Sequence, residues 1–135
     1  MEFILPAVLG AIAAMAIGMF WYSPKGFGKS WMLLTGMTPE KMKNPTNGVS
    51  MPVGTLLGFA SSMIKVAILA GIISVLAPAA LSGALFIGGM VWFGFFMTND
   101  IGAVLWEMKS WKLFFINTSY NLVMLLVSSA IIFYI

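Results

Sequence analysis

Long apolar runs separated by polar segments dominate the pattern of hydrophobic and polar positions along this chain. A helix rises about 1.5 Å per residue, so about 20 apolar residues cross the roughly 30 Å hydrocarbon core of a bilayer. The pattern therefore predicts four transmembrane helices, at approximately residues 3–22, 52–76, 80–106 and 111–134. The predicted fold class is an all-α polytopic membrane protein, with a single transmembrane domain over residues 1–135.

The connections between the runs predict two down-and-up hairpins. The link that follows Leu76, APAALSG, is short, so the second and third helices must be antiparallel neighbours. Residues 21–50 form a longer polar segment, in which Phe27, Trp31 and Leu34 fall on one side at helical spacing. This spacing predicts a short amphipathic segment on the membrane surface, between the first and second helices.

Aromatic residues with a polar atom mark the predicted membrane interfaces. Such side chains favour the level of the lipid headgroups, and in this chain they are Trp21, Tyr22, Trp31 and Trp111. Within the polar segment, Thr38, Pro39 and Glu40 predict the start of a short helix, because proline suits its first position and an acid its first turn.

Two helices carry faces of small residues. The first has a stripe at every fourth position, Gly10, Ala14 and Gly18. The second has a small and partly polar face, Gly54, Gly58, Ser61 and Lys65. Because small residues let helices approach closely in lipid, both faces predict packing against another helix.

Lys65 is the only charged residue between Met51 and Leu76, and it lies near the predicted membrane midplane. An ionised amine at this depth costs between about 2.5 and 17 kcal/mol, so it needs a partner or a polar cavity. Ser61 and Ser62 flank it and, with Lys65, are candidate residues of a polar pathway.

The last two helices offer possible partners for this lysine. Asp100 follows the apolar part of the third helix, and is either a charge in the headgroup region or the counter-ion of Lys65. Asn117 and Asn121 share a face of the fourth helix with Ser128, at spacings of four and seven residues. Hydrogen bonds between helices are the favoured interpretation of these asparagines.

The composition removes several classes of function. With 61% hydrophobic and 8% charged residues and a mean hydropathy of +1.01, the chain does not resemble a soluble domain. It has neither cysteine nor histidine, which excludes thiolate nucleophiles and the usual zinc, copper and haem ligands. We therefore expect no metal site and no cofactor. The net charge of +3 is interpreted as a topology signal, so the lipid bilayer and not nucleic acid is the expected partner.

Two functions remain open at this level. Ionisable residues within spans mark ion or substrate pathways, and four helices leave little room for a lumen. The sequence thus favours permeation or transport of a small solute or ion between the protomers of a homo-oligomer. The alternative is a membrane scaffold or regulatory partner, in which Lys65 bonds Asn121, Asp100 or backbone carbonyls. An enzyme is less favoured, because Asp100, Glu107 and Lys65 are its only acid–base candidates within or beside the spans.

Two strings resemble the DUF1761 family of small membrane proteins of unknown function. They are WYSPKGFGKSWM, at the end of the first helix, and WEMKSWKLFFINTSYNLV, which enters the fourth. The resemblance covers nearly the whole chain, and it implies four helices and a bacterial, inner-membrane location. It implies no activity, and the family pattern has no lysine like Lys65.

The lysines predict the orientation of the chain. Four lie between the first two helices and two between the last two, at positions 25, 29, 41, 43, 109 and 112. Lysine-rich connections stay in the cytoplasm, so both termini are predicted outside. A reporter that fluoresces only in the cytoplasm should stay dark when fused to either terminus, and fluorescence there would contradict this orientation.

Overall fold

The computed structural model describes residues 2–135, which form helices and connecting segments. The elements are α1 (Ile4–Trp21), α2 (Gly28–Thr35), α3 (Pro39–Lys43), α4 (Met51–Leu76), α5 (Leu81–Val91), η1 (Trp92–Met97), α6 (Thr98–Trp106) and α7 (Trp111–Tyr134). Within this part of the chain, four helices are long and apolar enough to cross a membrane: α1, α4, the continuous helix Leu81–Trp106 and α7. The predicted all-α fold class is confirmed, and the predicted spans differ from these bounds by one residue at most.

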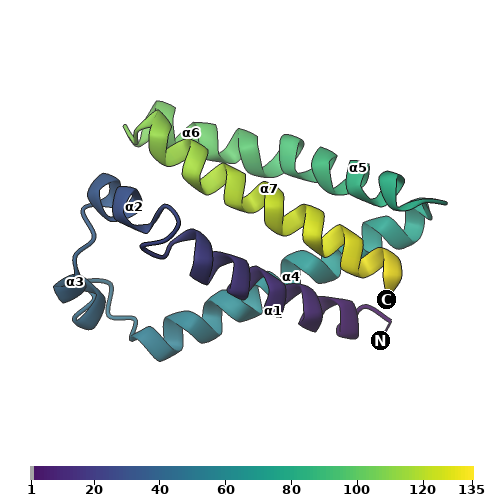
Figure 1. Ribbon diagram of the computed structural model, residues 1–135, viewed down its shortest axis with the longest axis horizontal. Helices are drawn as coiled ribbons and strands as arrows, with labels where there is room; N and C mark the ends of the chain where they lie inside the picture. The colour runs from purple at the N-terminus through teal and green to yellow at the C-terminus, as the bar shows by residue number, and fades with distance from the viewer. Residues whose placement is uncertain (1) are drawn as a thin grey trace.

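The spans run up and down, and α7 is the helix that the others share. It packs against α1, α4, α5 and α6, whereas α4 packs mainly on α1 and has few contacts with α5. Figure 1 shows both chain ends at one end of the bundle, with α2, α3 and the α6–α7 connection at the other. The chain therefore forms the two expected antiparallel hairpins, α1 with α4 and the third span with α7. The second and third spans, expected to be neighbours because their link is short, have few contacts, because each packs on its own hairpin partner.

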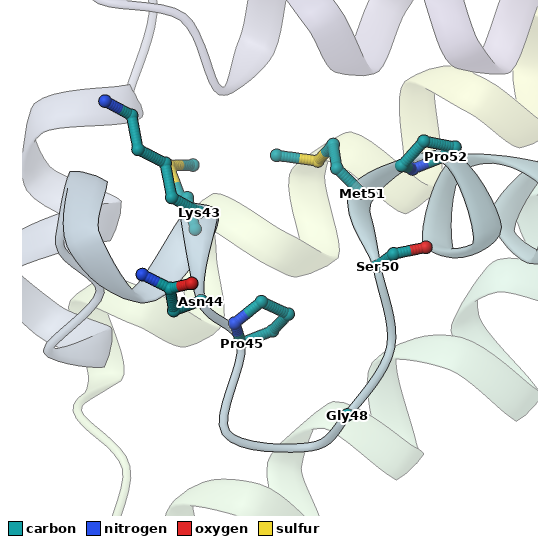
Figure 2. Close-up of a pocket in the computed structure, with 8 residues that line it drawn as sticks. Lys43, Asn44, Pro45, Gly48, Ser50, Met51 and Pro52 are labelled. Carbon is teal, nitrogen blue, oxygen red and sulfur yellow. The ribbon is translucent and has the colours of Figure 1, made fainter.

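The polar segment between α1 and α4 contains two short helices. Gly36 ends α2 in a left-handed conformation, with φ of 71°, which glycine adopts without steric cost. The predicted start of α3 is confirmed, because the Thr38 hydroxyl accepts a hydrogen bond from the Lys41 amide at 3.2 Å. A loop then leads to α4 and bounds an open hollow of about 690 Å³, in which Met51 reaches toward α3 while the Lys43 amine points away (Figure 2).

Small residues set the distance between the spans. A Cβ atom added at Gly10 would lie 2.6 Å from Val66, and one added at Gly18 would lie 3.3 Å from the Tyr120 hydroxyl. Ala14, between these two glycines, has no exposed surface. The stripe predicted on α1 therefore packs against α4 and α7, as close helix packing in lipid requires.

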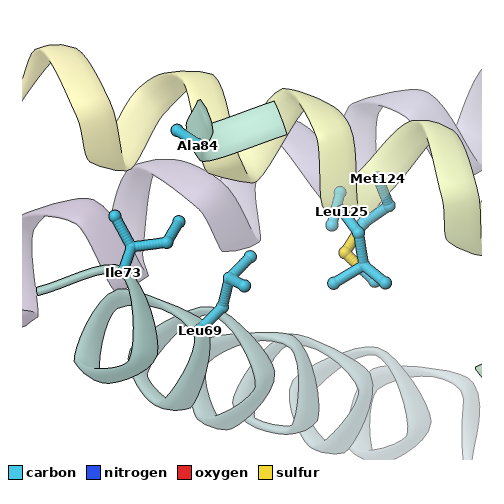
Figure 3. Packing of buried hydrophobic residues seen from close by; sticks show 6 residues of the cluster. Leu69, Ile73, Ala84, Met124 and Leu125 are labelled. Carbon is cyan, nitrogen blue, oxygen red and sulfur yellow. The ribbon is translucent and has the colours of Figure 1, made fainter. Parts of the chain in front are cut away.

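A compact apolar cluster joins all four spans. It consists of buried side chains from α1, α4, α5 and α7, namely Ala14, Leu69, Ile73, Ala84, Met124 and Leu125. Figure 3 shows Leu69 and Ile73 pointing from α4 toward the helices that carry the other members. Because lipid tails are as apolar as these side chains, dispersion contacts between well-fitted surfaces stabilise the cluster.

The third span departs from the regular helix expected from its sequence. Residues Trp92–Met97 form a π-helical segment between α5 and α6. Such a segment adds a residue to the helical turn, so the faces of α5 and α6 are out of phase. Hydrophobic periodicity did not reveal it, because the run from Trp92 to Met97 is apolar on every side.

Adjacent glycines on α5 test the close contact between α5 and α7. A methyl group at Gly88 would meet the Ser129 hydroxyl and lie 3.2 Å from the Leu125 carbonyl, whereas one at Gly89 would meet nothing within 4 Å. We expect Gly88→Ala to lower the unfolding free energy in detergent by about 1–3 kcal/mol. Gly89→Ala, the matched control, should be neutral or slightly stabilising. Equal effects of the two substitutions on thermal unfolding would contradict this packing.

Candidate functional site

A cluster of polar side chains lies where the end of α1 meets α6 and the first half of α7. We call it the Asp100 cluster, and its members are Tyr22, Asp100, Asn117, Thr118 and Asn121. Asp100 stands in the first turn of α6 and is partly buried. The Asn121 amide, on α7, donates a hydrogen bond to one of its carboxylate oxygens at 3.3 Å. Asn121 thus forms the interhelical hydrogen bond expected of it.

Tyr22 connects α1 to the same cluster. Its hydroxyl donates a hydrogen bond to Oδ1 of Asn117 at 2.8 Å, and its ring packs edge-on against Trp31 and Tyr120. Tyr22 lies just beyond the end of α1, where burial raises its pKa well above the usual 10.0, with smaller contributions from Tyr120 and Asp100. The phenol therefore stays protonated and remains a hydrogen-bond donor at neutral pH.

Two indoles bind backbone carbonyls of α7 beside this cluster. Nε1 of Trp21 donates to the Ile116 carbonyl at 2.9 Å, and Nε1 of Trp92 donates to the Thr118 carbonyl at 2.8 Å. Trp21 and Tyr22 are therefore partly buried links between helices, and their predicted level at the membrane interface stays a prediction. Trp31 is partly buried, and Trp111 remains 53% exposed.

Thr118 was not identified from the sequence. Its side chain is only 4% exposed, and its hydroxyl has no hydrogen-bond partner among the residues that the structure describes. Buried hydroxyls without a partner are rare, because the lost hydrogen bonds to water are not replaced. The Asp100 carboxylate is the polar group beside this hydroxyl, close enough to interact with it although the pair does not meet the geometry of a good hydrogen bond. Sequence patterning did not single out Thr118, since a threonine in an apolar helix commonly bonds its own backbone.

A cavity of about 240 Å³ opens next to the Asp100 cluster. Its walls combine polar and apolar side chains from α2, α6, α7 and the α6–α7 connection: Thr35, Asp100, Ala103, Val104, Lys109, Leu113, Phe114 and Asn117. An acidic, a basic and an amide residue thus border the same space, together with Thr35, whose hydroxyl already donates to the Trp31 carbonyl. Within residues 2–135, no three acidic side chains come close enough to hold a metal ion.

Lys65 lies apart from this cavity. Its side chain is exposed, and its amine is 5.9 Å from the centre of the Phe96 ring. It borders an apolar groove of about 370 Å³ between α4 and the helix formed by α5 and η1. Among the described residues, Lys65 makes no hydrogen bond or ion pair with Asp100 or Asn121, so the counter-ion alternative is not realised as a direct contact. The two charged residues line different cavities, although the amine is near enough to attract the Asp100 carboxylate electrostatically.

The small face of α4 points outward from the chain. Gly54, Gly58, Ser61 and Lys65 are exposed, and a Cβ atom at Gly58 would meet nothing within 4 Å. No helix among the described residues covers this face, so the predicted packing against another helix stays a prediction that a second chain would have to fulfil. Ser62 turns to the other side of α4 and is buried, at 7% exposure.

Comparison with known proteins identifies one family. The family model described as "Protein of unknown function (DUF1761)" matches residues 5–133, nearly the whole chain. A search of curated proteins and a search of solved structures each found no match. The resemblance seen in the two sequence strings is thereby confirmed.

The bond between Tyr22 and Asn117 makes a prediction for stability. Tyr22→Phe keeps the ring but removes the donor, so we expect the unfolding free energy to fall by about 1–2 kcal/mol in detergent. Tyr134→Phe is the control, because Tyr134 is 71% exposed. The raised pKa of Tyr22 means that its contribution is present below pH 10 and is lost as the pH rises further. The decline of stability above pH 10 should be shallower in Tyr22→Phe, and equal declines would contradict the burial of this phenol.

Proposed function

Because the chain belongs to the DUF1761 family, whose function is unknown, we infer its role from its own residues. We propose that the protein is a homo-oligomer through which a small solute with a negatively charged group crosses the membrane. A single observation carries the proposal: Lys65 is exposed on the outside of the chain, in the middle of a membrane-spanning helix.

Depth makes this position of Lys65 significant. It is the fifteenth of the 26 residues of α4, so both membrane surfaces are many residues away. Leaving the amine in lipid costs several kcal/mol, and a contact with the face of Phe96 offsets at most about 2 kcal/mol. Asp100 attracts the amine through space but does not bond it, so a polar surface outside the chain is the partner that we propose for it.

A second copy of the chain fits the small face of α4. Gly54 and Gly58 remove the side chains that would keep a neighbouring helix away, and every residue from Met51 to Gly58 is exposed. Two-fold contacts are the commonest in homo-oligomers, and they place the same face of each protomer at the axis. The lysines of the copies then lie near one another, and an anionic group passing between them relieves their repulsion.

We further propose a bacterial inner-membrane location with both termini outside. The bundle end that is opposite the chain termini carries α2, α3 and the α6–α7 connection (Figure 1). All lysines except Lys65 belong to this end or to the adjoining first turn of α7. This distribution favours a cytoplasmic position for that end.

Single cysteines test the oligomer, because the natural chain has none. We expect Gly58→Cys to form a disulfide-linked dimer in native membranes under mild oxidation. Ile12→Cys is the matched control: it is 53% exposed in the middle of α1, away from the small face of α4, and should stay monomeric. A crosslink from Gly58→Cys to a different protein, or none at all, contradicts the homo-oligomer, and the former favours the scaffold alternative.

Flux into liposomes that contain the purified protein tests the role of Lys65. We expect the wild type to admit chloride or L-alanine faster than protein-free liposomes do. Lys65→Met and Lys65→Ala should lower this flux by about tenfold, equivalent to roughly 1.4 kcal/mol of lost attraction. Lys112→Met, which removes a lysine at the membrane surface, should leave it unchanged. Flux that is absent, or equal in all variants, would overturn the proposal.

A further inference from the structure

The cavity beside Asp100 has the chemistry of a site for a small zwitterion. We propose that it binds a free amino acid with a short apolar side chain, with the ammonium group at Asp100 and the carboxylate group at Lys109. The cavity is distinct from the Lys65 face, so this proposal goes beyond the proposed function and does not rest on it. The binding site itself does not depend on the contact between protomers.

Asp100 supplies the negative side of the cavity. The Asn121 amide holds one carboxylate oxygen, which fixes the orientation of the carboxylate, while the side chain still lines the cavity. A carboxylate accepts several hydrogen bonds, so it has capacity for an ammonium group as well. An ammonium ion is the donor that best complements it, because charge-assisted hydrogen bonds are the strong ones.

Lys109 supplies the positive side, and the backbone places it there. After α6 ends, Met108 adopts a left-handed conformation with φ of 58°, and the Lys109 amide turns back to bond the Ala103 carbonyl at 3.1 Å. This turn brings Lys109 back beside α6, where its side chain lines the same cavity as Asp100. The flexible stem of a lysine lets its amine follow a carboxylate within the site.

Asn117 adds a second donor for the carboxylate group. Its Oδ1 atom accepts the hydrogen bond from Tyr22, which leaves its NH2 group as the part that is free to donate into the cavity. The amide is thus oriented before a ligand arrives. Such preorganisation reduces the entropy that is lost on binding.

The rest of the wall limits the size and polarity of the ligand. Val104, Leu113 and Phe114 form an apolar surface that suits a short aliphatic side chain. A volume of about 240 Å³ corresponds to roughly eight water molecules, and so to a solute of about eight non-hydrogen atoms, the size of valine. A simple cation would meet Lys109 and a simple anion would meet Asp100, so a ligand that carries both charges fits best.

Calorimetric titration of the purified protein in a zwitterionic detergent tests the site with three probes. L-valine carries both charges, valine methyl ester only the positive one and N-acetylvaline only the negative one. We expect L-valine to bind to the wild type at least tenfold more tightly than either derivative. Equal affinity for the ester and valine, or no heat above the protein-free blank with any probe, would overturn the proposal.

Variants assign the two ends of the ligand. Asp100→Asn and Lys109→Met should each weaken L-valine binding at least tenfold. Lys109→Met should leave the ester's affinity unchanged, and Asp100→Asn should not weaken that of N-acetylvaline. Glu107→Gln and Lys112→Met are matched controls, because these charged residues are near in the chain but do not line the cavity. Loss of binding in the controls as large as in the site variants would contradict the assignment.

The comparison of probes on the wild type decides the proposal even where a variant does not fold. Failure of the zwitterion-site proposal can also be distinguished from failure of the proposed transport function. Valine binding without flux or crosslinked dimers supports the site and overturns the transport oligomer. Flux and dimers without valine binding overturn the zwitterion site and leave the oligomer supported.

Discussion

A polar group in the hydrocarbon core finds no water, so it must be satisfied by protein, and this constraint organises the molecule. The Asp100 cluster satisfies the polar groups at one end of the spans, with Tyr22 contributing from just beyond the end of α1. Tyr22 and Asn117 join α1 to α7, Asp100 and Asn121 join α6 to α7, and the two indoles bond carbonyls of α7. The shared helix α7 is therefore held by polar links at one end and by the apolar cluster around Leu125 elsewhere.

Lys65 answers the same constraint differently, because nothing in its own chain bonds its amine in the described structure apart from the contact with Phe96. An exposed amine beside small residues in the middle of a span fits a neighbour better than it fits lipid. One chain thus carries two sites of opposite character. The cavity at Asp100 is built within one chain, whereas the role proposed for the Lys65 face requires a second surface to cover it.

Much of the fold was accessible from local pattern. The lengths and hydropathy of the runs predicted the spans to within one residue, the Thr38 capping sequence predicted α3, and the stripe at Gly10 and Gly18 predicted close packing. The π-helical segment Trp92–Met97 was not accessible, because an apolar run has no periodicity that an extra residue would disturb. The candidate site was predicted in part: Asp100, Asn117 and Asn121 were identified, but Thr118 and Lys109 were not.

The sequence by itself determined that the chain has four helices long and apolar enough to cross a membrane, and which few residues in them are polar. These properties depend on residues near one another in the chain. Only the tertiary structure decided how those residues combine. Tyr22 and Asn117 are 95 residues apart in sequence, and their contact depends on how α1 and α7 cross. Whether Asp100 meets Asn121 or Lys65 depends on the rotation of α6 after η1 and on the few contacts between α4 and α5. Helix rotation and crossing are set by packing across the whole bundle, and no local stretch of sequence specifies them.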